Sequence, residues 1–114
     1  MPIMQENIEA SGVTILRPIG RVDSANAPEM EKMLKGALDA GATKIVFELT
    51  QLDYISSAGL RVILMAAKKL GKGVGRVILV GMQAEVENVF VMSGFLAMFP
   101  NGRAQTLDEG LKLF

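Results

Sequence analysis

The sequence predicts a single α/β domain, residues 1–114, in which a mixed, mostly parallel sheet of four to five strands packs with about four α-helices. Strand-like segments alternate with segments whose apolar residues recur at helical spacing, and this alternation implies right-handed crossovers. The almost wholly apolar run 76–80 (RVILV) is typical of a buried parallel strand. A chain of 114 residues can bury one core without metals or disulfides.

Two strands and a helix are expected in the first third of the chain. Residues 13–19 favour a strand, and Pro18, which lacks an N–H donor, indicates an edge position or the strand's end. A weaker strand at 3–8 would form a hairpin with it across residues 10–12. Residues 23–41 predict a helix, with Ser24 or Asn26 as its cap and Gly41 as its stop. Its first turn suits Pro28 and Glu29, and its apolar stripe is Ala27, Met30, Leu34, Ala37 and Leu38.

The middle of the chain predicts a strand and a second helix. Residues 44–49 form a strand with Ile45, Phe47 and Leu49 on one face, and an exposed face or a sheet edge would explain Glu48. The helix runs from about Ser57 to Gly71. Its apolar positions are Leu60, Ile63, Leu64 and Ala67.

After the strand at 76–80, a short helix is expected over 84–92, ending around Ser93 and Gly94. A brief strand is possible at 97–99. Thr106 and Glu109 fit a capping box that begins a last helix. The residues expected to face the core here are Val86, Val89 and Phe90 in the short helix, and Leu107, Leu111 and Phe114 in the last one.

The composition excludes several classes of chemistry. The chain has no histidine and no cysteine, so a Ser-His-Asp triad, a Cys-His dyad and zinc sites built on these residues are all impossible within it. We therefore expect no metal, no cofactor and no catalytic residue. Twelve basic and twelve acidic residues balance, which argues against nucleic acid or an anionic membrane as a partner. The first ten residues lack the pattern of a signal peptide, and a cytoplasmic location is expected.

The stretch 54–61 (YISSAGLR) places two hydroxyls at the predicted start of the second helix. Taken alone, Ser56 and Ser57 are most simply explained as N-caps. The glycine-rich run 71–75 (GKGVG) precedes a strand and lacks the spacing of a nucleotide-binding loop, so it is interpreted as a flexible turn.

Two segments, 20–27 (GRVDSANA) and 49–64 (LTQLDYISSAGLRVIL), resemble the STAS family, whose best-known bacterial members are anti-sigma factor antagonists. The strands 44–50 (KIVFELT) and 76–82 (RVILVGM) fit the same pattern, so the resemblance covers essentially the whole chain. It implies a phosphorylation-controlled partner switch without enzymatic activity. The unphosphorylated form would bind an anti-sigma factor serine kinase with a GHKL-type ATPase fold and free its sigma factor or other target. A metal-dependent serine phosphatase would reset the switch.

Matching on Gly59 and Leu60, the resemblance places the phosphoacceptor at Ser57, with Ser56 the less favoured alternative. The best-known members often carry Asp at the preceding position, where this chain has Ser56, and Ala58 replaces a second hydroxyl. A helix N-terminus tolerates an anion, which independently supports Ser57. Gly59 would leave room for an incoming active site. The residues expected to contact the partner are Asp23, Ser24, Asn26, Ser56, Ser57, Ala58, Gly59 and Arg61.

Simpler roles exist for several of these residues. Asp23 fits a turn equally well, Ser24 and Asn26 fit helix caps, and Arg61 fits a solvated helix face. Asp53 is interpreted as a turn residue.

Two other functions stay open. One is a non-phosphorylated STAS subunit that binds a ligand or serves as a scaffold in a sensor or transporter assembly. The other is a small serine hydrolase, which without histidine would need Lys68 or Lys69 as its base.

Overall fold

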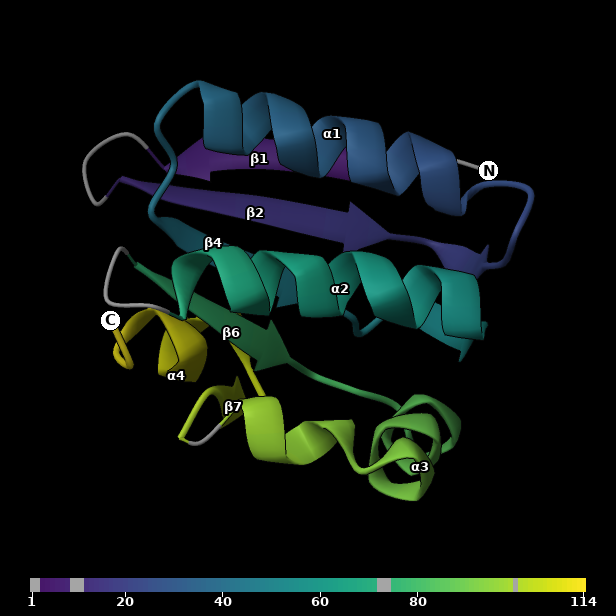
Figure 1. The fold of residues 1–114 in the computed structure, drawn as a ribbon. Coiled ribbons are helices and arrows are strands. Elements are labelled where there is room, and N and C mark those ends of the chain that lie inside the picture. The colour runs from purple at the N-terminus through teal and green to yellow at the C-terminus, as the bar shows by residue number, and fades with distance from the viewer. Residues whose placement is uncertain (1–2, 9–11, 72–74, 100) are drawn as a thin grey trace.

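The computed structural model describes residues 3–8, 12–71, 75–99 and 101–114. A five-stranded sheet runs through it in the order β1-β2-β4-β6-β7, in which β1 is antiparallel to β2 and the other neighbours are parallel (Figure 1). The predicted mixed, mostly parallel sheet is therefore confirmed. Its strands are β1 (Ile3–Ile8), β2 (Val13–Pro18), β4 (Lys44–Glu48), β6 (Arg76–Val80) and β7 (Arg103–Ala104).

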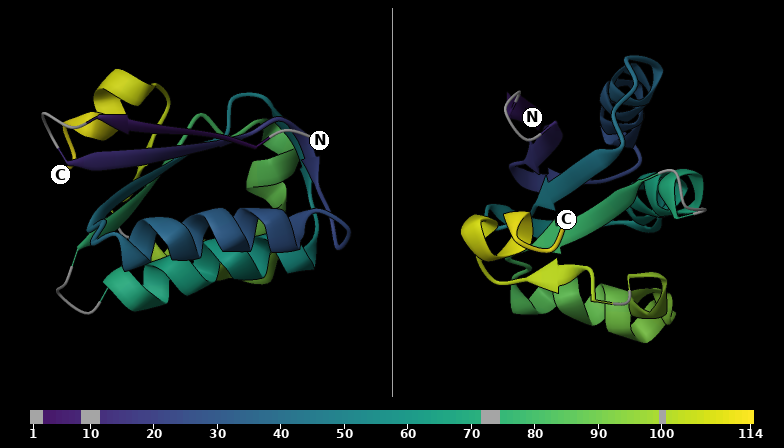
Figure 2. Two further views of the ribbon diagram at one scale, coloured as in Figure 1. Left: turned by 90° about the horizontal axis from the view of Figure 1, so that it is seen from above. Right: turned by 90° about the vertical axis from the view of Figure 1, so that its left-hand side faces the viewer.

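Four α-helices and one 3₁₀-helix pack around this sheet. Figure 2 shows α1 and α2 side by side on one face and α4 on the other. None of the helices in the described ranges is long and apolar enough to cross a membrane. The helices are α1 (Ala27–Asp39), α2 (Ser57–Leu70), α3 (Ala84–Ser93), the 3₁₀-helix η1 (Phe95–Met98) and α4 (Leu107–Leu111).

The core has two parts because successive side chains of a strand point to opposite faces of the sheet. The larger part lies under α1 and α2, where Phe47, Leu49 and Leu79 are fully buried. This confirms the predicted inward face of β4. The smaller part lies under α4 and is built from Val13, Ile15, Val46, Ile78 and Val80, against which Leu107, Leu111 and Phe114 pack as predicted.

Most of the predicted element ends are confirmed. Pro18 lies at the end of β2, Gly41 follows α1 with a positive φ of 93°, and Gly71 caps the end of α2. Both hydrogen bonds of the capping box between Thr106 and Glu109 are present at α4. The turn predicted at 10–12 and the glycine-rich run 71–75 lie partly outside the described residues.

A second, two-stranded parallel sheet was not predicted. It pairs β3 (Gly20–Val22) with β5 (Leu52–Ile55). Gly20, with φ at 83°, turns the chain directly out of β2, and its N–H donates to the Gln51 carbonyl at 2.8 Å. Asp53, interpreted as a turn residue, is an exposed residue of β5.

The strand predicted at 97–99 is wrong. Gly94, in the left-handed conformation, ends α3 and starts η1, and the Phe99 ring then packs edge-to-face on Phe90 at 6.1 Å between centroids. This aromatic contact fixes the segment as a compact helical turn. The chain joins the sheet only later, at β7.

The explanation of Glu48 by a sheet edge or an exposed face is also wrong. Glu48 is 9% exposed and lies on β4, in the middle of the sheet. Its Oε2 accepts from Arg17 Nε at 3.0 Å, and its Oε1 accepts from both the backbone N–H (2.9 Å) and the hydroxyl of Thr50. Burial alone would raise the pKa of Glu48, but the Thr50 hydrogen bonds and Arg17 outweigh it and leave the pKa below its usual value.

Glu48→Gln should therefore lower stability at neutral pH, by about 1–3 kcal/mol, because it removes hydrogen bonds to a charged group. A carboxyl group whose pKa is lowered by folding stabilises the folded state at pH values above the pKa that the group has in the unfolded chain. This contribution disappears as the pH falls through the lowered pKa of the folded state. The difference between wild type and Glu48→Gln should thus shrink below about pH 4, as measured by urea denaturation across pH. Glu31→Gln, which removes only a surface pair with Lys35, should cost less than about 0.5 kcal/mol. A loss of stability from Glu48→Gln that is the same at every pH would contradict the role assigned to the ionised Glu48 carboxylate.

Candidate functional site

The pairing of β3 with β5 brings two distant parts of the chain together. Val22 is the register partner of Ile55, and the Ser56 N–H donates to the Val22 carbonyl at 2.8 Å. Asp23 follows β3 and Ser56 follows β5, so both lie at the same end of this small sheet. The two segments that carry the family resemblance therefore form one surface.

The two neighbouring serines have different roles. Ser56 is the N-cap of α2, with extended backbone, and its Oγ accepts from the Gly59 N–H at 3.3 Å. Ser57 is the first residue of the helix and is exposed. Within the described part of the chain its hydroxyl has no hydrogen-bond partner. The prediction of Ser56 as a cap is confirmed, and Ser57 offers a free hydroxyl at the helix N-terminus.

Gly59 does not leave room for an incoming active site, as the sequence suggested. It is buried and faces the core, where a Cβ would lie 2.6 Å from Val22 Cγ1 and 2.9 Å from Ile55 Cγ1. Its lack of a side chain lets the first turn of α2 rest directly on β3 and β5. The close packing of Gly59 on β3 and β5 thus fixes the position of Ser57. Gly59 itself is buried and is not available to contact a partner, contrary to the prediction.

The loop between β3 and α1 is held by its own side chains. Asp23 Oδ1 accepts from the N–H groups of Ala25 (3.0 Å) and Asn26 (3.3 Å), and Asn26 Oδ1 accepts from the Asp23 N–H at 2.8 Å. Asn26 Nδ2 also donates to the Arg21 carbonyl at 2.9 Å. The turn role of Asp23 is therefore confirmed. Asn26 is the N-cap residue of α1, as predicted, although its side chain makes no cap hydrogen bond, and Ser24 lies outside the cap position.

Two arginines lie at this surface. Arg61 Nε donates to the Ser57 carbonyl at 3.3 Å, so an exposed cation accompanies the free hydroxyl. Arg21, which the sequence did not single out, pairs with Asp23 Oδ2 at 3.4 Å and stacks over the Tyr54 ring at 4.8 Å from its centroid. The contact between Arg21 and Tyr54 depends on the pairing of β3 with β5. These strands are too short for an alternating pattern to reveal them in the sequence.

A shallow groove of about 320 Å³ between the first turns of α1 and α2 contains three of the predicted partner-binding residues. These are Ser24, Ala58 and Arg61. Asp23, Asn26, Ser56 and Ser57 lie in or next to the adjoining loops, so the structure brings all the exposed members of the predicted set to one end of the molecule.

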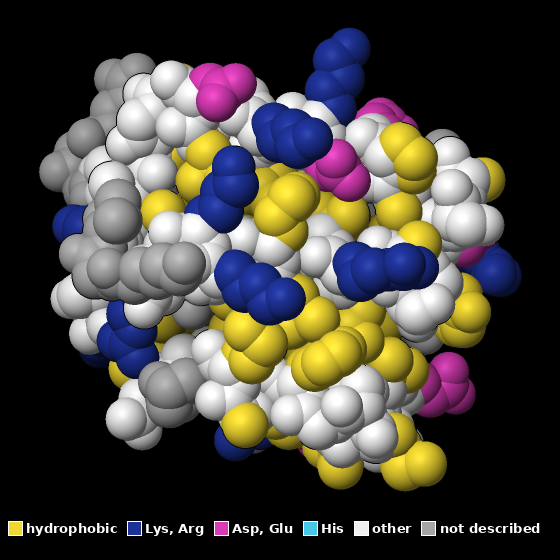
Figure 3. All heavy atoms as spheres, in the orientation of Figure 1, with side chains coloured by type: hydrophobic (Ala, Val, Ile, Leu, Met, Phe, Trp, Pro, Cys, Tyr) yellow, Lys and Arg dark blue, Asp and Glu magenta, His cyan; other side chains and the backbone are white. Residues whose placement is uncertain are grey.

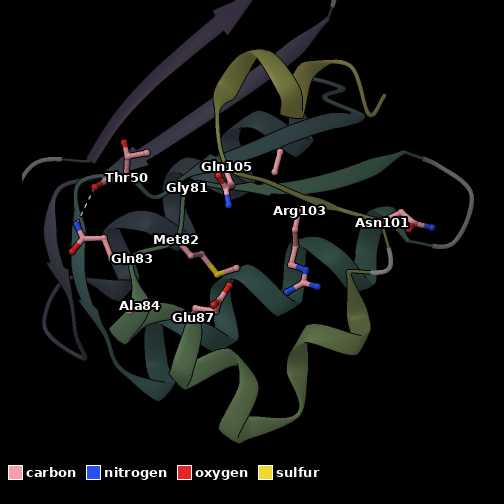
Figure 4. Close-up of a pocket in the computed structure, with 10 residues that line it drawn as sticks. Thr50, Gly81, Met82, Gln83, Ala84, Glu87, Asn101, Arg103 and Gln105 are labelled. Atoms are coloured by element: carbon pink, nitrogen blue, oxygen red, sulfur yellow. Dashed lines mark hydrogen bonds between the residues drawn. The ribbon is translucent and has the colours of Figure 1, made fainter.

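A larger open cleft of about 790 Å³ lies beyond the carboxyl ends of β4 and β6 (Figure 4). Its lining mixes polar and apolar surface, with Glu87 on α3 and Arg103 on β7 as the charged side chains. Gln83 Nε2 donates to the Thr50 carbonyl at 2.9 Å across one end. Clefts at the carboxyl ends of parallel strands often bind small ligands, and no motif in the sequence indicated this one.

The two lysines considered as bases for a serine hydrolase lie at the wrong end of α2. Lys68 and Lys69 are in its last turn, and a rise of about 1.5 Å per residue places them roughly 16 Å along the axis from Ser57. A general base must come within hydrogen-bond reach of its nucleophile. This pairing is therefore excluded.

Comparisons with known proteins agree with this geometry. The family model of the STAS domain matches residues 5–110. BtrV of Bordetella bronchiseptica, predicted to be an anti-sigma factor antagonist, is 41% identical over 100 residues, which cover 88% of this chain and 84% of BtrV. A predicted anti-sigma factor antagonist from Thermotoga maritima has a similar structure, with a TM-score of 0.86, 23% identity, and coverage of 96% of this chain and 92% of that one.

The structure of the anti-sigma factor antagonist SpoIIAA is similar in both of its forms. Unphosphorylated SpoIIAA matches with a TM-score of 0.82 and 22% identity, over 97% of this chain and 94% of that one. Phosphorylated SpoIIAA of Bacillus matches with a TM-score of 0.76 and 21% identity, over 97% of each chain. At these identities the likeness establishes a shared fold.

Gly59→Ala should destabilise the protein by about 1–3 kcal/mol, because the added methyl overlaps Val22 and Ile55. The matched control is Gly36→Ala in α1, where a Cβ meets nothing within 4 Å. That substitution should stabilise the protein by about 0.5–1 kcal/mol through helix propensity. Chemical denaturation measures both, and equal effects of the two substitutions would contradict the packing role of Gly59.

Ser56→Ala should cost about 1 kcal/mol because it removes the cap of α2. Ser57→Ala should change stability by less than about 0.5 kcal/mol, since the hydroxyl it removes is exposed and has no partner among the described residues. Thermal or urea denaturation of the two variants checks this contrast. A larger loss from Ser57→Ala than from Ser56→Ala would reverse the assignment.

Proposed function

This chain belongs to the STAS domain family, and we propose that it acts within that family as an anti-sigma factor antagonist switched by phosphorylation of Ser57. In the unphosphorylated form it binds an anti-sigma factor that is also a serine kinase, and thereby frees a sigma factor or another target. The phosphorylated form does not bind.

The observation that carries this proposal is the division of roles between the two serines. Ser56 is half-buried and its oxygen accepts from the Gly59 N–H, so transfer of a phosphoryl group to this oxygen would disturb the cap of α2. Ser57 is exposed and unengaged within the described residues, so a kinase can reach it without disturbing the fold. Ser57 is therefore the better acceptor.

The electrostatics of the helix end support a switch that acts on binding. The first turn of α2 contains no acidic residue, and its N–H groups carry the positive end of the helix dipole. A phosphate of about −1.5 to −2 charges is tolerated there, and Arg61, one turn further along, donates from its guanidinium back to the Ser57 carbonyl. SpoIIAA has this fold in both its unphosphorylated and phosphorylated forms, which supports a switch that leaves the fold intact.

The partner would supply the reaction chemistry. The kinase, of the GHKL-type ATPase fold, brings ATP and the base that accepts the Ser57 proton, and a metal-dependent phosphatase removes the phosphate afterwards. This chain contributes the acceptor and the surface that is recognised. That surface comprises Ser57, Ala58 and Arg61 on α2 together with the Asp23 loop, including Ser24 and Asn26.

The cleft in Figure 4 supports a second candidate, a STAS subunit that binds a small ligand or serves as a scaffold without being phosphorylated. Its lining combines a carboxylate, a guanidinium and several amide groups, which suits a polar molecule. Purification of the protein from its own cells with no phosphate on Ser57 and with a small molecule bound would favour this candidate over the switch.

The test of the switch uses two acidic substitutions one residue apart. Ser57→Ala should bind the cognate anti-sigma factor kinase as wild type does, and Ser57→Asp should bind at least tenfold more weakly in calorimetry. Ser56→Asp is the matched control, because Asp also caps helices and adds the same charge at the neighbouring position. It should bind within about threefold of wild type, because the side chain at position 56 is half-buried and turned toward the Gly59 N–H.

Incubation with the kinase and ATP gives a second measurement. Mass spectrometry should find one phosphoryl group on the wild type and on Ser56→Asp, and none on Ser57→Ala. Equal weakening by Ser56→Asp and Ser57→Asp, or phosphate retained on Ser57→Ala, would show that position 57 is not the switch.

A further inference from the structure

A second groove borders Ser57 on the side away from α1. It lies between α2 and the segment formed by α3 and η1, and has a volume of about 480 Å³. Leu60 of α2, Val89 and Met92 of α3, and Phe95 of η1 give it an apolar lining. Figure 3 shows hydrophobic side chains gathered between α2 and this segment. We call it the α2–α3 groove.

The last turn of α3 presents apolar side chains to solvent, although the helix also has a buried inner side. Val86 and Phe90 are fully buried and anchor it. Met92 at the groove is 87% exposed, and its neighbour Val91 is 54% exposed. Single exposed apolar residues are common, but a contiguous apolar hollow indicates a surface that contacts another molecule. Methionine in particular adapts to different partner shapes.

The groove is preformed. Gly94, with φ at 77°, ends α3, and its N–H is directed to the carbonyls of Phe90 and Val91. The Ser93 hydroxyl donates to the Phe90 carbonyl at 3.0 Å, and the Phe90 ring is packed against Phe99. The end of α3 that carries Met92 is therefore held in place, and binding there requires little ordering of the backbone.

The charge of the lining indicates what the groove binds. Its three remaining lining residues, Ser57, Asn88 and Ser93, are polar but uncharged, so no side chain in the lining would pair with a charged group. Ser57 is both part of this lining and the exposed hydroxyl at the start of α2. A kinase whose active site reaches the Ser57 hydroxyl therefore covers the groove with the part of its own surface that surrounds the active site.

We propose that the α2–α3 groove receives an apolar side chain of the anti-sigma factor kinase, an inference that rests on the function proposed above. A phosphate on Ser57 would place about two negative charges at the edge of this contact. The lining of the groove supplies no cation to pair with that charge, so burying it beside an apolar side chain is costly. Occupation of the groove and phosphorylation of Ser57 would therefore oppose each other, which would account for the loss of binding proposed for the phosphorylated form.

The test compares two adjacent exposed positions of α3 in the full, unphosphorylated chain. Met92→Glu should weaken binding to the kinase at least tenfold, because Met92 lines the groove. Val91→Glu adds the same charge to the same helix at a position outside the lining, and should change binding less than threefold. Since both side chains are exposed, thermal denaturation should show wild-type folding for both.

The absence of cysteine from the chain allows a direct measurement of contact. Met92→Cys and Val91→Cys each introduce a single thiol. Addition of the kinase should slow alkylation of the thiol at position 92 by at least fivefold and leave that at position 91 nearly unchanged.

The outcomes separate this inference from the proposed function. Weak binding by Ser57→Asp with full binding by Met92→Glu would overturn the groove contact and leave the switch standing. Equal loss from Val91→Glu and Met92→Glu would show a general charge effect and overturn it as well. An apolar small molecule that co-purifies with the wild type but not with Met92→Glu, with kinase affinity unchanged, would assign the groove to that ligand instead. No detectable kinase binding by the wild type would overturn the proposed function itself.

Discussion

The contact of Gly59 with Val22 and Ile55 determines where the functional end of this molecule lies. Helix α2 begins directly after β5, β5 is paired with β3, and β3 continues from the main sheet across Gly20. Each of these connections is short, so the position of Ser57 is closely tied to the core. A methyl group at position 59 would separate α2 from both strands at once, and the Ser57 hydroxyl would move relative to the loop at Asp23 and to the groove beside α3.

The alternation of apolar runs was enough to predict four of the five strands of the main sheet and the four α-helices of the described residues. Strand β7 was missed because its two residues are too few to form a pattern. The small sheet escaped detection because β3 and β5 have three and four residues, too few for a period of two to stand out. Glu48 was misjudged because its partner Arg17 lies 31 residues away on another strand. The capping rule gave the role of Ser56 correctly, but the inward orientation of Gly59 depends on packing that no local pattern records.

The proposed switch needs no reactive group of its own. Its elements are an exposed hydroxyl at the positive end of a helix, an arginine one turn further along, and two grooves beside α2, of which the one next to α3 has an uncharged lining. A phosphate changes the charge of that small area while the buried core beneath it stays unaltered. Such a design separates stability, which depends on Gly59 and the core, from recognition, which depends on residues that the fold leaves exposed.

The cap formed by Ser56 leaves the charge at this position open. The Gly59 N–H donates to an oxygen at position 56, and a serine hydroxyl or an aspartate carboxylate can provide it equally well. Exchange of Ser56 for Asp would therefore keep the start of the helix intact while adding one negative charge beside Ser57. The same geometric requirement can thus be met with or without a charge, and the fold does not depend on the choice.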